Sequence, residues 1–265
     1  MKKLSPPVLL GGLCLAAFAA HAEDPPAPPA SPFTGKVGLY TEYEYRGISQ
    51  TSEKPALQLN LDYAHASGFY IGTFISNIKW IKDTGKVLGE DTGNANFEWD
   101  IYGGYRWEFV KDWTLDVGYL RYEYVSSKAA PPFFVKPNTD EVYAGVTYGP
   151  ATLKYSYSFN NTFGVPESKG SDYIELTVNQ PIIDKLTFNG TAGRQRYKGH
   201  QGDPVDFNNN GFSYSVYKAG LTYDVGGGFN VGGYYKTTSA NSAYWTYLGK
   251  DWSKNRFVGF VTYSF

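Results

Sequence analysis

The sequence predicts an all-β fold, a transmembrane antiparallel up-and-down β-barrel of about twelve strands with short periplasmic turns and long extracellular loops. Three observations predict it. Apolar and polar residues alternate in nearly every ten-residue window after residue 33. Short and long connections alternate along the chain, and the last predicted strand ends in an aromatic residue, Phe265.

The chain begins with the pattern of a secretory signal peptide. Two lysines precede an apolar run over residues 8–20, and Ala-His-Ala at residues 20–22 supplies the small residues of a cleavage site. The run is too short to span a bilayer. We therefore expect a cleaved signal peptide at 1–22, and its removal takes away Cys14, the only cysteine, so that the mature chain has no disulfide.

Composition favours strands and excludes several other classes. The chain has 24 Tyr, 17 Phe, 6 Trp and 30 Gly among 265 residues, which are residue types of strands and tight turns. Without the two lysines of the signal peptide, 22 basic residues face 25 acidic ones, a formal charge of −3, so nothing points to a nucleic acid partner. No segment after residue 22 has 18 consecutive apolar residues, which excludes transmembrane helices.

The mature chain divides into two predicted parts, a Pro-rich periplasmic tail at 23–32 and an outer-membrane β-barrel at 33–265. Residues 57–63 illustrate the barrel pattern, because Leu and Tyr at odd positions alternate with Gln, Asn and Asp at even positions. The predicted strands are 36–46, 56–64, 68–79, 96–108, 113–125, 140–149, 151–160, 172–180, 186–197, 213–225, 229–238 and 255–265.

Connection lengths give the predicted barrel an orientation. The short connections lie around Ala66, Lys111, Pro150, Asp184 and Gly227, and they alternate with long ones around Thr51, Gly85, Pro131, Phe163, Asp203 and Asn241. Short turns of outer-membrane barrels face the periplasm and long loops face outside. A soluble sandwich has no reason to follow this alternation.

Two local features refine the prediction. In the strand 113–125 the apolar phase changes near Tyr119, which indicates a β-bulge and puts Leu120, Tyr122 and Tyr124 on the lipid side. Aromatic residues also mark strand ends and predict two girdles at the membrane interfaces. One girdle holds Trp107, Trp113, Tyr148, Tyr223 and Phe229, and the other holds Tyr45, Trp80 and Trp99.

The polar face of each strand is expected to line the lumen. The candidates are Glu42, Glu44, Arg46, Gln58, Asn60, Asp62, Glu98, Asp100, Arg106, Asp116, Arg121, Glu123, Glu141, Lys154, Glu175, Lys218, Lys236 and Arg256, together with Arg194 or Arg196. Acids and bases nearly balance, so these charges either cross-link into a plug or line a wet, weakly selective pore. Twelve strands about 4.8 Å apart, tilted by roughly 40°, close into a cylinder of roughly 24 Å, between filled eight-stranded barrels and open sixteen-stranded ones.

Other candidate sites have plainer interpretations. The segment Arg46 to Gln50 reads as a pore-mouth or loop-folding element, or as a tight turn that needs Gly47 and hydrogen bonds from Ser49, and we favour the turn. Glu98 and Asp100 read as ion-pair partners of Arg106 or other inward bases rather than as an acid/base pair.

We expect no enzyme activity, no cofactor and no metal. The mature chain has two histidines, His65 beside a periplasmic turn and His200 in an outer loop, and neither stands with a nucleophile. The loop acids Asp83, Glu90 and Asp91 lack the spacing of a calcium loop and read as solvated charge.

A family resemblance covers essentially the whole mature chain. Its motifs are Tyr45-Arg46-Gly47-Ile48-Ser49-Gln50, Pro55-Ala56-Leu57-Gln58, Asp62-Tyr63, Gly68-Phe69-Tyr70, Ser76-Asn77-Ile78-Lys79-Trp80, residues 98–105 and residues 141–146. In these motifs the chain resembles the TorF-like outer-membrane porins, conserved proteins of the Gcw_chp type. Leu59-Asn60 departs from the Gly-rich pair expected after Gln58. The resemblance implies a porin whose solute is not established.

Together these features predict a porin-like channel for passive diffusion of small hydrophilic solutes in the outer membrane of a Gram-negative bacterium. The alternative is a non-conducting barrel with a structural, adhesive or loop-mediated binding role. Expected partners are outer-membrane lipid and lipopolysaccharide, small solutes, and the outer-membrane assembly machinery. Tyr263 and Phe265 resemble the C-terminal signature that this machinery reads.

Overall fold

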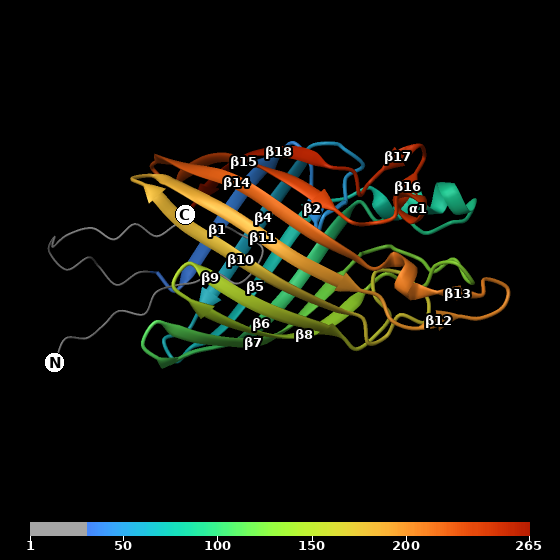
Figure 1. Ribbon diagram of the computed structural model, residues 1–265, viewed down its shortest axis with the longest axis horizontal. Helices are drawn as coiled ribbons and strands as arrows, with labels where there is room; N and C mark the ends of the chain where they lie inside the picture. The colour runs from blue at the N-terminus through green and yellow to red at the C-terminus, as the bar shows by residue number, and fades with distance from the viewer. Residues whose placement is uncertain (1–30) are drawn as a thin grey trace, which may run out of the picture.

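The computed structural model describes residues 31–265 (Figure 1). The predicted signal peptide at 1–22 and all but two residues of the predicted tail at 23–32 lie outside the described residues.

Twelve strands form one closed antiparallel barrel, as the sequence predicts. They are β1 (Phe33–Tyr40), β4 (Ala56–Ala64), β5 (Phe69–Asn77), β6 (Phe97–Val110), β7 (Trp113–Glu123), β8 (Thr139–Tyr148), β9 (Ala151–Ser158), β10 (Asp172–Ile183), β11 (Leu186–Arg196), β14 (Tyr214–Gly226), β15 (Phe229–Thr238) and β18 (Arg256–Ser264). Each strand pairs with its sequence neighbour, and β1 pairs with β18 to close the cylinder, with Leu39 opposite Val261.

Short elements occupy the long connections. These are the hairpin β2 (Glu44–Tyr45) and β3 (Ile48–Ser49), α1 (Trp80–Leu88), the pair β12 (His200–Gln201) and β13 (Phe207–Asn208), the 3₁₀ turn Asn209–Phe212, α2 (Ser242–Trp245), and the pair β16 (Thr246–Tyr247) and β17 (Lys250–Asp251). Figure 1 shows α1, β12, β13, β16 and β17 at one end of the barrel, and the C-terminus at the opposite end.

The alternation of residues along each strand separates an outer wall from an inner face. On β5, Phe69, Ile71 and Ile75 are exposed on the outer wall, whereas Tyr70 and Phe74 on the alternate face are buried. The outer wall is therefore a band of apolar side chains, the surface that lipid tails cover in a membrane barrel. None of the helices in residues 31–265 has the length and apolarity that a membrane crossing requires.

The predicted first strand, 36–46, is wrong at both ends. Strand β1 starts at Phe33 and ends at Tyr40, and residues 44–49 form a separate hairpin. Inside that hairpin Arg46 and Gly47 both have positive φ, 47° and 88°. Two consecutive left-handed residues make the tight turn that reverses the chain, so the alternating pattern of residues 42–46 belongs to a different element from the barrel strand.

The predicted β-bulge near Tyr119 is also wrong. Strands β6 and β7 pair without a shift from Trp99–Glu123 to Glu108–Thr114. Leu120, Tyr122 and Tyr124 point inward and are buried. The ring of Tyr122 packs edge-on against Tyr45 of the inserted hairpin, and the ring of Tyr124 packs edge-on against Trp80. The register shifts that do occur lie beside short turns, between Glu108 and Val110, for example.

One of the two aromatic girdles has the predicted composition. Trp107, Trp113, Tyr148, Tyr223 and Phe229 are all exposed on the outer wall near short turns, and the rings of Trp113 and Tyr148 stack at 4.5 Å. In the second girdle, Trp99 is exposed, but Tyr45 belongs to the inserted hairpin and Trp80 is buried. These two rings face the inside of the molecule because the long loops fold over the barrel mouth.

Candidate pore and outer vestibule

The β2–β3 hairpin is inserted into the barrel. Its turn residue Gly47 lies so close to the wall that a Cβ atom there would stand 2.6 Å from Thr238 Cγ2 and 2.8 Å from Val216 Cγ2. These contacts and the positive φ both select glycine. The predicted tight turn at Arg46-Gly47 thus exists, and it is at the same time the tip of an element that enters the lumen.

Arg46 crosses from the hairpin to the far wall. Its guanidinium donates to both carboxylate oxygens of Glu141 on β8, at 2.9 and 2.7 Å, and to Gln195 Oε1 on β11 at 2.9 Å. The ring of Tyr173 lies 4.3 Å below the guanidinium carbon. Arg46 is 7 % exposed and Glu141 is 1 % exposed, so this is a buried bidentate ion pair.

The other side of the hairpin is held by β14 and β15. Glu44 accepts from Lys218 Nζ at 3.1 Å, and also from the hydroxyl of Tyr234. Lys236, fully buried, donates to the backbone oxygens of Gly47 and Trp252 at 2.7 and 3.3 Å. Opposite walls of the barrel therefore bind the same hairpin. The hairpin, residues 44–49, is a fixed element across the lumen and is called the cross-piece below.

A polar cavity of about 240 Å³ lies on one side of this cross-piece. Four acids and four bases are among its lining residues, namely Glu42, Glu44, Asp116 and Glu175 with Arg46, Arg106, Lys154 and Lys218. All four cations lie over aromatic rings: Arg46 over Tyr173 as described above, Arg106 over Tyr70 and Lys154 over Tyr143 at 4.0 Å each, and Lys218 over Tyr234 at 5.5 Å. The charges are thus partly neutralised by one another and by ring faces.

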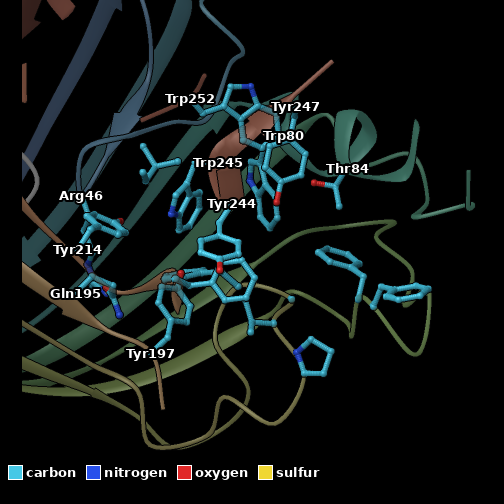
Figure 2. Close-up of a pocket in the computed structure, with 18 of the residues that line it drawn as sticks. Arg46, Trp80, Thr84, Gln195, Tyr197, Tyr214, Tyr244, Trp245, Tyr247 and Trp252 are labelled. Atoms are coloured by element: carbon cyan, nitrogen blue, oxygen red, sulfur yellow. The ribbon is translucent and has the colours of Figure 1, made fainter. Parts of the chain in front are cut away.

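A second cavity of about 320 Å³, here named the outer vestibule, lies on the other side of the hairpin. Residues from all six long connections line it, and most of them are aromatic (Figure 2). Tyr45 and Arg46 are the two described residues that line both cavities. The hairpin tip is therefore the partition between the vestibule and the polar cavity.

Most predicted lumen residues of the wall lie on the inner face of their strands. These are Gln58, Asn60, Asp62, Glu98, Asp100, Arg106, Asp116, Glu141, Lys154, Glu175, Lys218, Lys236 and Arg256. Glu42, Glu44 and Arg46 reach the lumen from the 41–55 connection, where Glu42 lies 3.5 Å from Arg256.

Arg121 and Glu123 are placed differently from the prediction. Arg121 pairs across β7 and β8 with Asp140, whereas the neighbouring position Leu120 pairs with the inward Glu141, so Arg121 and Glu123 lie on the outer face. They form ion pairs there, at 2.6 Å with each other and at 3.0 Å between Arg121 and Asp140. The erroneous bulge reversed the assignment of faces at this end of β7.

Arg194 and Arg196 are outward as well, whereas Gln195 between them is inward and 1 % exposed. Gln195 is absent from the predicted lumen residues, although it is one of the two wall residues whose side-chain oxygens accept from Arg46 Nη1. Thr187 and Asn189 face inward on β11, and the two-residue period of a strand places Gln195 on the same inner face.

Glu98 and Asp100 do not form the expected ion pair with Arg106, which pairs instead with Asp116 at 3.1 Å. The hydroxyl of Tyr43 donates to Glu98 at 2.5 Å, and among residues 31–265 neither oxygen of Asp100 has a hydrogen-bond partner. Arg106 lies six residues further along β6, too far for its side chain to reach them.

Ionisable residues of the outer loops carry two shifted pKa values relevant to the vestibule and its surroundings. The hydrogen bond from Arg256 lowers the pKa of Glu53, which lies 2.6 Å away. Burial raises the pKa of Tyr247 to about 12. Within the described part of the chain, no three His, Cys, Asp or Glu side chains gather as a metal site.

At the opposite end of the barrel, Phe265 is 62 % exposed, and its backbone exchanges hydrogen bonds with Gly35. Tyr263 precedes it by two residues on the same face of β18, and the two rings are 6.0 Å apart. The aromatic terminus thus presents its side chains outward at the seam where β18 meets β1.

Comparison with known proteins agrees with this architecture. A family model described as "Bacterial protein of unknown function (Gcw_chp)" matches residues 26–265. Among solved structures, a KdgM porin is similar with a TM-score of 0.54 at 9 % identity, covering 88 % of this chain and 99 % of that one. A NanC porin has a TM-score of 0.54 at 10 % identity, covering 87 % and 98 %. No curated protein matches. The fold is therefore that of a porin barrel.

Proposed function

The chain belongs to the Gcw_chp family, and from this premise we propose that it is a porin-like channel of the Gram-negative outer membrane, for passive diffusion of small hydrophilic solutes. The observation that carries the proposal is the polar cavity, because charged residues of both signs line it inside an apolar outer wall. A wetted interior within a lipid-facing surface is what a diffusion pore requires. The resemblance to TorF-like porins is part of the same proposal.

The inserted hairpin would set the size limit of this channel. Twelve strands enclose more space than the eight whose side chains fill a barrel. The hairpin occupies part of that space, and the Arg46–Glu141 pair bridges much of what remains. We therefore propose a narrow pore of low conductance. Because four acids face four bases in the polar cavity, its ion selectivity should be weak.

The burial of the hairpin residues supports a second candidate function, a non-conducting barrel that binds a partner through its outer loops. Ser49 is fully buried and Arg46 nearly so, as expected of a permanent plug. In both cases the proposed environment is outer-membrane lipid with lipopolysaccharide, and Tyr263 and Phe265 would form the recognition element for the assembly machinery.

Recording of single channels in planar bilayers separates the two candidates. We expect the refolded mature protein to insert and give small stepwise openings, with similar permeability to small cations and anions. Repeated insertion without steps would support the plugged barrel and contradict the channel. A strong bias toward either ion would contradict the balanced lining.

A further inference from the structure

Within residues 31–265, the charges on the outer face of the barrel strands are confined to one rim. Six charged residues of these strands face outward, and they are Arg121, Glu123, Asp140, Asp172, Arg194 and Arg196. All six belong to β7, β8, β10 and β11, and each lies at or near the strand end that adjoins a long connection. Charge at the rim of an apolar wall lies where lipid tails give way to headgroups.

The outward charges on β7 and β8 neutralise one another. Arg121 donates to Glu123 at 2.6 Å and to Asp140 at 3.0 Å, so that one guanidinium lies between two carboxylates. The carboxylate side chains are 22 % and 13 % exposed. On these two strands no outward cation is therefore left without a carboxylate partner.

The outward charges at the end of β11 are mostly basic. Arg196 pairs with Asp172 at 2.6 Å, whereas Arg194 donates to the hydroxyl of Ser215 at 3.2 Å. Lys198 follows at the next alternate position and is exposed. Among residues 31–265, no carboxylate lies at ion-pair distance from Arg194 or Lys198. Arg194, Arg196 and Lys198, called the basic strip below, thus carry three positive charges against one carboxylate.

Two inward residues fix the direction of the basic strip. Gln195 and Tyr197 lie between its members and are 1 % and 4 % exposed. Both line the outer vestibule (Figure 2), where Gln195 accepts from Arg46 and the ring of Tyr197 lies 5.9 Å from that of Phe212. Because successive side chains of an extended chain point to opposite faces, burial of these two side chains turns the basic strip toward the outside.

Apolar side chains lie directly beside and below the basic strip on the outer wall. Ile174 of β10 is opposite Arg194, and Tyr217 lies one alternate position below on β14; they are 37 % and 54 % exposed. At about 3.3 Å per residue and a tilt of roughly 40°, Arg194 stands about 20 Å above Leu186, near the upper edge of an apolar band about 25 Å tall. A molecule at the strip therefore meets cations and an apolar surface together.

We infer that the basic strip binds the phosphate-bearing headgroup of a lipid in the outer leaflet, the lipid A part of lipopolysaccharide, with the acyl chains on the apolar wall below. Guanidinium groups match the geometry of phosphate oxygens. A soluble anion would gain nothing from the apolar side chains beside the strip, so the surroundings favour a lipid. The inference rests on the proposed outer-membrane location, and it concerns the outer wall rather than the path of the solute.

Native mass spectrometry of the folded protein in nonionic detergent tests the inference, with diphosphoryl lipid A as the probe. We expect a one-to-one complex, and about tenfold weaker binding of the same lipid A after removal of both phosphates. Inorganic phosphate should compete no better than sodium chloride of equal ionic strength, because it has no acyl chains. Absence of a complex, equal binding of the two lipids, or full displacement by inorganic phosphate would overturn the lipid site. Single-channel recordings test the proposed channel separately, because conduction does not depend on this binding.

Variants of the two exposed, unpaired members of the basic strip locate the binding. Arg194→Gln and Lys198→Gln remove one cation each and keep the ion pair of Arg196, so each should weaken lipid A binding about fivefold, the effect of one basic residue at an anionic lipid surface. Arg121→Gln is the matched control and should bind as the wild type does, because two carboxylates already neutralise this outward arginine. A heat-dependent shift on gels confirms that each variant has folded. Unchanged binding in both strip variants, or an equal loss in the control, would contradict the inference.

Discussion

Replacing residues 44–49 with two glycines should raise single-channel conductance roughly tenfold, because a twelve-stranded barrel without an inserted element has an open interior. The deletion removes both ends of the cross-piece, the Arg46–Glu141 pair and the Glu44–Lys218 pair. None of the replaced residues belongs to the twelve strands of the barrel. Conductance in planar bilayers measures the result, and a heat-dependent shift on gels confirms that the variant has folded.

The matched control replaces residues 202–206, in the β12–β13 connection, with two glycines, because Gln201 and Phe207 are paired and need a turn between them. These residues contribute only Val205 to the vestibule lining and none to the polar cavity. Conductance of this control should remain close to that of the wild type. If the hairpin deletion conducts no better than the wild type, the hairpin is not the constriction.

Glu141→Ala should lower the free energy of unfolding by about 3–5 kcal/mol, because it leaves the guanidinium of Arg46 buried without its charge partner. Arg46 is 7 % exposed, and Glu141 is its ion-pair partner. Urea titration of the protein in phospholipid vesicles measures the loss. Glu53→Ala is the control, since Glu53 is 35 % exposed in its pair with Arg256 and should cost less than about 1 kcal/mol.

The double variant Arg46→Met/Glu141→Leu separates charge from packing. It removes both charges together, so it should recover most of the stability that Glu141→Ala loses. If the double variant is as unstable as the single one, the pair contributes through shape rather than charge, and the electrostatic account of the hairpin fails.

The barrel could be predicted from the sequence because its signal is periodic and repeated. Residues 57–63 alternate between a lipid side and a water side, and the same two-residue period returns in strand after strand. The alternation of short and long connections then fixed the number and direction of the strands. All five short turns lie at the expected positions in the structure.

The hairpin could not be predicted in the same way. Residues 42–46 continue the polar–apolar rhythm of β1, although Arg46 and Gly47 turn the chain back inside the lumen. Tyr122 is aromatic on the inner face for the same reason, since its ring packs against Tyr45 of this hairpin. The local sequence shows whether one face of a strand is polar or apolar. It does not show which segment, distant in the sequence, packs against that face.

The outer vestibule could not be predicted from the sequence for a similar reason. Trp80 and Tyr45 have the composition of an interfacial girdle, and nothing local distinguishes a ring that meets lipid from one that meets other rings. The six loops that bring the aromatic side chains together are separated by whole strand pairs in the sequence. Only the closed barrel places them at one mouth.

Single-cysteine accessibility along β10 tests most directly the central claim, that alternate residues face lipid and a wetted lumen. In liposomes, a small membrane-impermeant thiol reagent should modify Glu175→Cys and Thr177→Cys, which line the polar cavity, and should spare Ile174→Cys and Leu176→Cys on the outer wall. All four should react after unfolding in detergent. Equal reaction at neighbouring positions in the folded protein, or protection of 175 and 177 alone, would contradict the claim.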